Sequence, residues 1–249
     1  MTGLRMGAMN VGPLSVDTNL LVAFAPGHLE IPTTAAVVVH PTHGVGLWDT
    51  GINGAIADTE RREAYWGVNA ATAFAPHAFR RDHAVDTQLE KLGIKPKEVP
   101  YVLYSHLHLD HAGGMSYFPD AIHVVQRDEI RYAVSADTRT NPVYCGNGFR
   151  DIRKLEILEI DGEFNLFEDG TLRVLKTPGH SPGLPRCQLC EVLWRIDLLQ
   201  YQHMHLIISI CFYFKKYAAK RCATDICVEW RSRGKPRSER LNAPRSETR

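Results

Sequence analysis

The 249-residue sequence predicts an α/β fold of the α+β type, and two patterns support this fold class. Short apolar runs rich in Val, Ile and Leu recur along the chain and are typical of β-strands. Between them lie segments with an apolar residue at every third or fourth position, which is typical of helices. Hydrophobic residues make up 44% and charged residues 23% of the chain, and these values are ordinary for a globular protein. The chain is long enough for one large α/β domain, or for one domain with an appendage.

The N-terminal third is expected to contain mostly strands. Residues 14–24 mix β-branched and apolar residues and are expected to form one or two strands. Residues 34–40 form a continuous apolar run, which is typical of a strand covered on both faces. After a turn, residues 45–49 return as the hairpin partner of this strand. Residues 52–81 lack a clean period, so we expect a long loop whose aromatic residues form a lid, a substrate wall or a surface excursion.

The middle of the chain is expected to alternate between helices and strands. Asp82 is the expected N-cap of a helix that extends to Leu92, with Gly93 as its stop. The other predicted helices cover residues 112–117 and 127–134. The other predicted strands cover residues 101–104, 121–125, 155–160 and 172–175, and two Asp-Gly turns separate the last two of these strands.

A group of four polar residues after the strand at 101–104 carries the strongest chemical signal. His106, His108 and Asp110 recur at every second residue, so an extended segment would point all three in one direction. His111 breaks this period and approaches from another direction. Imidazole and carboxylate groups are the ligands expected for zinc and related divalent metals. Two ligand directions therefore predict two metal positions.

Two further polar residues stand at strand ends. Asp49, in Asp49-Thr50-Gly51, is either a turn residue or a carboxylate that orients a ligand histidine. His180 lies in a Gly- and Pro-rich turn after the strand at 172–175. Strand ends from different parts of the chain can meet at one edge of a pair of sheets, so we interpret His180 as a further metal ligand. His123 lies within a strand, and we interpret it as structural.

The composition changes after Gly183. Residues 1–183 hold 16 basic and 22 acidic residues, a balance of −6, whereas residues 184–249 hold 13 and 6, a balance of +7. Eighteen of the 19 glycines lie in the first part, and five of the six cysteines lie in the second. We therefore divide the chain into a domain at 1–183 and an atypical basic, Cys-containing tail at 184–249, whose last part is expected to be disordered. A frameshift or inserted DNA after codon 183 explains this change most simply, and a divergent appendage is the alternative.

Apolar runs and charge also indicate the cellular location of the protein and its binding partners. The first residues lack the apolar core of a secretory signal, and the longest apolar run, Leu206 to Phe214, is too short to span a bilayer. We therefore expect a cytoplasmic protein without a membrane partner. The acidic balance of residues 1–183 argues against nucleic acid as a partner.

The polar residues form a pattern that resembles a known family. The motif His106-x-His108-x-Asp110-His111, with Asp49-Thr50-Gly51 before it and a Thr-Pro-Gly-His turn at His180, resembles the metallo-β-lactamase superfamily. Within the superfamily, the chain is most similar to the quorum-quenching N-acyl homoserine lactonases. The stretches that carry this resemblance are 105–113, 118–120, 124–129 and Tyr132-Ala133. The resemblance covers roughly residues 14–183 and implies an αββα sandwich, whose C-terminal half we expect to be incomplete here.

The resemblance also implies roles for individual residues. His106, His108 and His180 would hold a first zinc ion, Asp110 and His111 would hold a second, and Asp49 would support these ligands. The zinc ions would share a hydroxide that opens a lactone ring. Asp110, the implied catalytic residue, would also handle the proton that is passed during ring opening. The expected partner is a small molecule, an acyl homoserine lactone or a related ester or thioester. Dimers are common among similar lactonases, so a homodimer is expected.

Two residues that the family requires are not recognisable. These are an Asp that bridges the two metals, in the segment after His180, and a last His near the C-terminus. Asp197 is the nearest carboxylate, but its surroundings do not match. Three functions therefore remain open: a zinc-dependent hydrolase of lactonase type, a glyoxalase-II-like thioester hydrolase, and an inactive truncated remnant. The long aromatic segment before Asp82 favours the lactonase over the thioesterase. We expect fewer zinc ions than the family's two per chain, and little turnover.

Overall fold

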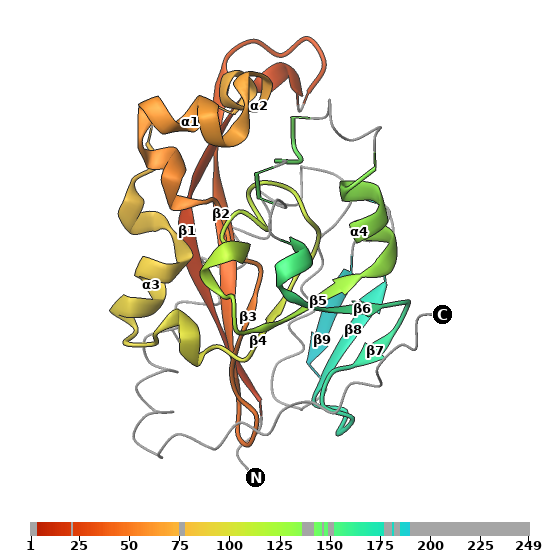
Figure 1. Cartoon of the computed structure of the whole chain (residues 1–249). Helices are drawn as coiled ribbons and strands as arrows, with labels where there is room; N and C mark the ends of the chain where they lie inside the picture. The colour runs from red at the N-terminus through yellow and green to blue at the C-terminus, as the bar shows by residue number, and fades with distance from the viewer. Residues whose placement is uncertain are drawn as a thin grey trace.

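A computed structural model shows two β-sheets with helices packed beside them (Figure 1). The structure describes residues 4–20, 22–74, 78–135, 142–145, 147–148, 152–176, 181 and 185–189. His180 and residues 190–249, which include most of the predicted tail, lie outside the described residues. In the part of the chain that the structure describes, no helix is long and apolar enough to cross a membrane.

The larger sheet has six strands in the order β1-β2-β3-β4-β5-β6. The first three strands are antiparallel, and β3, β4, β5 and β6 run parallel to one another. The carboxyl ends of these parallel strands therefore meet at one edge, where ligands bind in open α/β sheets. The six strands are β1 (Arg5–Asp17), β2 (His28–His40), β3 (Gly44–Trp48), β4 (Tyr101–Leu103), β5 (Ile122–Gln126) and β6 (Glu156–Ile160).

The smaller sheet has three antiparallel strands, β7 (Phe164–Asn165), β8 (Leu172–Lys176) and β9 (Pro185–Leu189). Strand β9 lies just beyond the predicted boundary at Gly183 and pairs along the whole of β8. The boundary itself stays a prediction.

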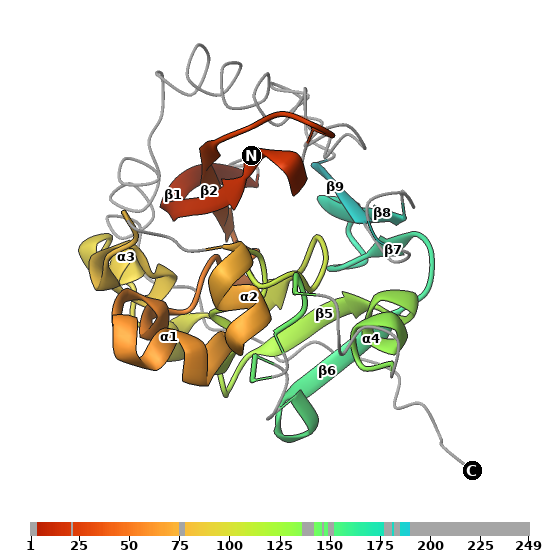
Figure 2. The ribbon, with the colours of Figure 1, turned by 90° about the horizontal axis from the view of Figure 1, so that it is seen from above.

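Among the described residues, four α-helices accompany the sheets: α1 (Thr59–Trp66), α2 (Val68–Ala73), α3 (Val85–Lys91) and α4 (Arg127–Ala133). Seen from above, α1, α2 and α3 lie on one side of the molecule and the three-stranded sheet lies on the other (Figure 2). Short 3-10 helices occupy Thr18–Leu20, Gly54–Ala57, Arg81–His83, Pro96–Glu98, Met115–Tyr117 and Ile152–Lys154.

The six-stranded sheet is buried on both faces, as the apolar run at 34–40 predicts. Val37 and Val39 of β2 pack in one core with Leu89 of α3. Ala36 and Val38 pack in the other core, which includes residues of β8. Because successive side chains of a strand point to opposite faces, one apolar strand serves both cores. A helical layer, a large sheet and a small sheet thus confirm the predicted α+β sandwich.

The prediction of a long loop at 52–81 was wrong, because α1 and α2 lie within this segment. The carboxylate of Asp58 caps α1 by accepting the N–H groups of Glu60 and Arg61 at 3.0 and 3.3 Å. Trp66 is the buried residue of this helix, so α1 carries no apolar stripe that a periodicity search could detect. The aromatic residues of this segment pack into a third core with Leu14 and Val16 of β1.

Other predicted boundaries shift by a few residues. The helix predicted from Asp82 begins at Val85, with Ala84 as its N-cap, and residues 81–83 form a 3-10 turn. The predicted helix at 112–117 is reduced to a 3-10 turn. The first strand begins at Arg5, well before residue 14. The structural interpretation of His123 is confirmed: it is buried and bonded to the Tyr104 hydroxyl and the Phe118 carbonyl, both at 2.9 Å.

Candidate metal centre

The predicted ligands gather at the carboxyl ends of the parallel strands. Asp49 directly follows β3, and the segment from His106 to His111 follows β4, which ends at Leu103. The backbone N–H of Asp49 donates to the Leu103 carbonyl at 2.8 Å, so the two strand ends are tied together. The predicted ligands therefore lie at the edge where the sheet topology favours a binding site.

The segment after β4 is held tightly against the segment after β3. The Thr50 backbone N–H and hydroxyl both donate to the His111 carbonyl, at 2.7 and 3.0 Å. Gly51 forms a β-bridge with Ala112. A Cβ atom at Gly113 would lie 2.6 Å from the Asn53 nitrogen, so only glycine fits there. The backbone around the predicted ligands is thus fixed by direct contacts.

Three imidazole rings lie in contact at this edge. The centroid of the His106 ring lies 4.3 Å from that of His108 and 4.1 Å from that of His111. Leu107 and Leu109, which alternate with these residues, are fully buried in hydrophobic cores. The expected alternation therefore holds, although the segment is a loop beyond the end of β4 instead of a strand.

Asp49 and Ser105 orient two of the imidazoles. The Ser105 backbone N–H and hydroxyl donate to the two oxygens of Asp49, each at 2.7 Å. His111 Nδ1 lies 2.9 Å from Asp49 Oδ2, and His106 Nδ1 lies 3.0 Å from Ser105 Oγ. All of these contacts are satisfied when both histidines carry their proton on Nδ1. Each ring then presents an unprotonated Nε2, the form that binds a metal.

The backbone of Asp49 reflects this role. Its φ of 59° lies in the left-handed region, which is uncommon for residues other than glycine but tolerated by Asp. The side chain is 3% exposed. Of the two interpretations left open by the sequence, a turn residue or an orienting carboxylate, the hydrogen bonds favour the second.

Asp110 and His111 have the spacing of two ligands of one ion. Asp110 Oδ2 lies 3.4 Å from His111 Nε2. Two ligand atoms of a tetrahedral zinc ion, each about 2.1 Å from it, are separated by about 3.4 Å. Burial lowers the pKa of His111, but the carboxylates of Asp110 and Asp49 outweigh it and raise the pKa to about 9. The electrostatic field at this point therefore favours a positive charge.

Three residues that support the site were not predicted from the sequence. They are Ser105, Glu129 in α4 and Tyr144. Glu129 Oε1 accepts the Leu107 backbone N–H at 2.9 Å and the Tyr144 hydroxyl at 3.2 Å. Glu129 lies in the stretch 124–129 that carries the family resemblance, but an acidic residue in the first turn of a helix is an ordinary feature, so no role at the site was predicted for it. His180, the remaining predicted ligand, lies outside the described residues, and so does Asp197.

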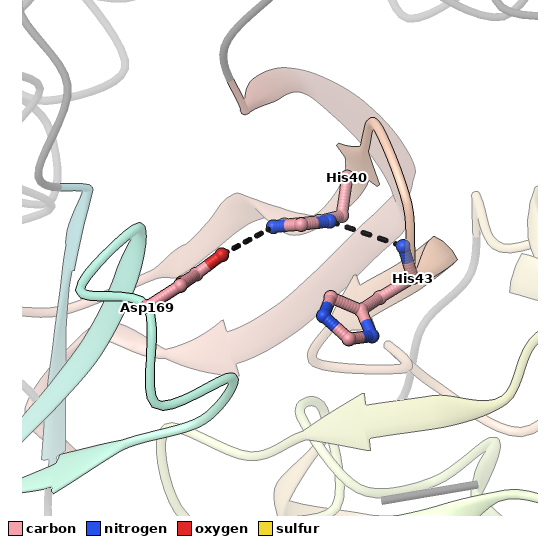
Figure 3. Close-up of side chains that lie close together, drawn as sticks. All are labelled: His40, His43 and Asp169. Atoms are coloured by element: carbon pink, nitrogen blue, oxygen red, sulfur yellow. Dashed lines mark hydrogen bonds and ion pairs between the residues drawn. The ribbon is translucent and has the colours of Figure 1, made fainter. Parts of the chain in front are cut away.

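A second group with metal-type side chains lies at the other end of β3. His40, His43 and Asp169 have ligand atoms within 4.8 Å of one another (Figure 3). His40 Nε2 lies 3.1 Å from Asp169 Oδ2, while His40 Nδ1 accepts the backbone N–H groups of Thr42 and His43 at 3.1 and 3.0 Å. This arrangement joins the β2–β3 turn of the large sheet to the β7–β8 turn of the small one. The sequence did not predict it.

Comparison with known proteins relates the chain to one family. Residues 30–187 match the model of the metallo-beta-lactamase superfamily. The N-acyl homoserine lactonase AttM of Azorhizobium caulinodans is 34% identical over 188 residues, which cover 74% of this chain and 70% of AttM. The N-acyl homoserine lactonase AiiA of Bacillus thuringiensis subsp. kurstaki is 27% identical over 161 residues, covering 65% of this chain and 60% of AiiA.

Solved structures share the fold. An N-acyl homoserine lactone hydrolase with N-hexanoyl-L-homoserine bound at its catalytic metal centre has a TM-score of 0.63 at 20% identity, covering 88% of this chain and 90% of its own. AidC, a dizinc quorum-quenching lactonase, has a TM-score of 0.57 at 14% identity, covering 89% and 86%. At these identities the likeness concerns the fold.

Proposed function

The chain belongs to the metallo-beta-lactamase superfamily, and from this premise we propose that it is a zinc-dependent hydrolase that opens N-acyl homoserine lactones. One observation carries the proposal. Asp49 and Ser105 hold the Nδ1 atoms of His111 and His106, so that both rings can present Nε2 to a metal. The 3.4 Å separation of Asp110 Oδ2 from His111 Nε2 adds a carboxylate to this donor set.

The donor set fits zinc, because imidazole nitrogen and carboxylate oxygen are ordinary zinc ligands. We propose that His106, His108 and His180 hold one zinc ion and that Asp110 and His111 hold a second. When bound, zinc supplies an activated water and polarises a carbonyl group. The protein contributes the orientation of the rings through Asp49 and Ser105. Asp110, whose side chain is 20% exposed, is proposed to take up and return the proton during ring opening.

The remaining parts of the proposal concern the whole chain. We propose residues 1–183 as the hydrolase domain and residues 184–249 as an atypical tail. The recognisable ligands number five, so zinc content below two ions per chain is expected. We propose a cytoplasmic location because no apolar run of the sequence is long enough to span a bilayer. We propose a homodimer because dimers are common among similar lactonases.

Metal content and hydrolysis, measured on the same purified full-length chain, test this proposal. We expect N-hexanoyl homoserine lactone to be opened with little turnover, this activity to be lost after chelation, and zinc to restore it. Release of acid during ring opening can be followed with a pH indicator. Faster hydrolysis of a glutathione thioester than of the lactone would instead indicate the thioesterase. A folded, zinc-loaded chain that hydrolyses neither substrate would indicate the inactive remnant.

A further inference from the structure

Glu129 is a fully buried acidic residue close to the predicted ligands. It lies in the first turn of α4, which begins directly after β5, and its exposed fraction is 0%. Burying a carboxylate is costly unless hydrogen bonds and nearby positive charge compensate for the lost water. A buried carboxylate at this edge of the sheet therefore requires a physical explanation.

The first contact of Glu129 lies between two predicted metal ligands. Its Oε1 accepts the backbone N–H of Leu107 at 2.9 Å. Leu107 separates His106 from His108, and its own side chain is fully buried in the core. The carboxylate thus fixes the peptide that connects the two histidines, while the core fixes the side chain between them.

The second contact of Glu129 reaches the other side of His108. The Tyr144 hydroxyl donates to Glu129 Oε1 at 3.2 Å. The Tyr144 ring stands against the His108 ring at 89°, with centroids 4.7 Å apart. One carboxylate oxygen therefore controls the backbone before His108 and the aromatic ring that packs against its imidazole.

The charge of Glu129 also reaches the centre. Its carboxylate binds the peptide that links His106 to His108, so this negative charge lies beside both predicted ligands. The field of this charge attracts a divalent cation, and it acts more strongly in the buried surroundings of Glu129 than it would at the surface.

We propose that Glu129 is a positioning residue for the metal centre, which holds His106 and His108 in place through Leu107 and Tyr144 and increases zinc affinity through its charge. This proposal rests on the proposed function only in requiring that the centre binds zinc. The competing explanation is a buried acid that stabilises the fold and has no effect on zinc.

Zinc affinity, measured by competition with a chromogenic chelator, separates the two explanations. Glu129→Ala removes the acceptor and the charge, and a lost supporting contact of this kind weakens metal binding by about 10- to 100-fold. Glu129→Gln keeps an oxygen that can accept both hydrogen bonds but loses the charge, so we expect a smaller loss of about threefold or more. Tyr144→Phe keeps the ring and should weaken binding least.

Two matched controls isolate the effect. Asp128→Asn removes a charge from the neighbouring position of α4, where the carboxylate pairs with Lys176 and is 44% exposed. Val174→Ala destabilises the distant core beside β8, where Val174 is 2% exposed. Both controls should keep the zinc affinity of the unaltered protein. Thermal unfolding of the zinc-free proteins shows how much of each effect is due to stability alone.

The following zinc-affinity results would contradict the proposed role of Glu129. Glu129→Ala with unaltered zinc affinity would do so, and so would a loss no larger than that of a Val174→Ala variant of equal stability. If Glu129→Ala does not fold, Glu129→Gln decides, and unaltered affinity in that variant overturns the proposal. A chain that binds zinc but opens no lactone contradicts the proposed substrate alone, because the zinc comparison still applies. A chain that binds no zinc contradicts both proposals.

Discussion

In the part of the chain that the structure describes, histidines gather at two places, at opposite ends of β3. At the carboxyl end, His106, His108 and His111 lie beside Asp49 and Asp110. At the other end, the group of His40, His43 and Asp169 joins the two sheets. Both groups combine imidazoles with carboxylates, so residue type alone does not distinguish them.

The hydrogen bonds of the ring nitrogens make the difference. Each of His106 and His111 has its Nδ1 beside an oxygen acceptor, so in the neutral form of each ring Nε2 carries no proton and can bind a metal. His40 Nδ1 accepts two backbone N–H groups, so its proton must reside on Nε2, which faces Asp169. A metal at His40 would have to displace this proton while both acceptor contacts persist. These hydrogen bonds favour a cation at the first group and a structural contact at the second.

The sharpest test of this comparison removes one imidazole from each group. His106→Ala is expected to lower zinc affinity by more than about 100-fold, because losing even a supporting contact costs 10- to 100-fold. Lactone hydrolysis should be lost with the metal. His43→Ala, the matched change, should leave zinc affinity unaltered. Chelator competition measures both, and an equal loss in the two variants would remove the distinction between the groups.

The second prediction exchanges one carboxylate for an amide. Asp49→Asn keeps the shape of the side chain but weakens its acceptance of the His111 and Ser105 protons. Zinc affinity should fall by about 10- to 100-fold. The same change at Asp169 should have no effect on zinc. If Asp49→Asn binds zinc as well as the unaltered chain, Asp49 acts only as a turn residue.

The third prediction concerns stability at the second group. Asp169→Ala removes the contact of 3.1 Å to His40 that joins the two sheets. The carboxylate is 39% exposed, so solvent screening limits the loss to about 0.5–1 kcal/mol in the free energy of unfolding. Urea unfolding of the zinc-free protein measures this. No change in the midpoint would indicate that the two turns are held together by other contacts.

The difference between the two groups was only partly predictable. The predicted ligands from His106 to His111 lie within six residues, so their common direction follows from local geometry alone. His40 and Asp169 are separated by 129 positions, and only the packing of two sheets brings them together. Glu129 and Leu107 are 22 positions apart and meet because α4 follows the strand next to β4.

The fold also contains elements that local sequence patterns predict and elements that they do not. Strands with continuous apolar runs, such as β2, were predicted because burial on both faces leaves a strong pattern. Helix α1 was missed because it buries Trp66 alone and depends on its Asp58 cap. The turn at 112–117 was mistaken for a helix because the tight contacts of Gly113 and Gly114 with the segment after β3 are tertiary. Local patterns therefore predicted strands and ligands, whereas their supporting contacts required the structure.

The smallest expected effect is a pH dependence that originates at His40. Burial lowers the pKa of His40 from its ordinary value of 6.5, and nearby His43 lowers it further, although Asp169 acts in the opposite direction. Between the folded-state pKa and 6.5, the unfolded chain binds more protons than the folded chain. The contribution of His40 to the free energy of unfolding should therefore decrease as the pH falls through this window. Below the folded-state pKa this contribution is lost completely.

Urea unfolding at about pH 7.5 and about pH 5.5 measures this loss on the two sides of the ordinary histidine pKa. Burial also lowers the pKa values of His123 and His83, which contribute in the same direction, whereas the raised pKa of His111 makes it contribute in the opposite direction. His40→Asn separates the contribution of His40 from the others, because an Asn oxygen can accept the same turn N–H groups and does not titrate. We expect this variant to lose less stability on acidification than the unaltered chain. An equal loss would assign the effect to the other histidines with lowered pKa values, His123 and His83, and the second histidine group would then make only a pH-independent contact between the sheets.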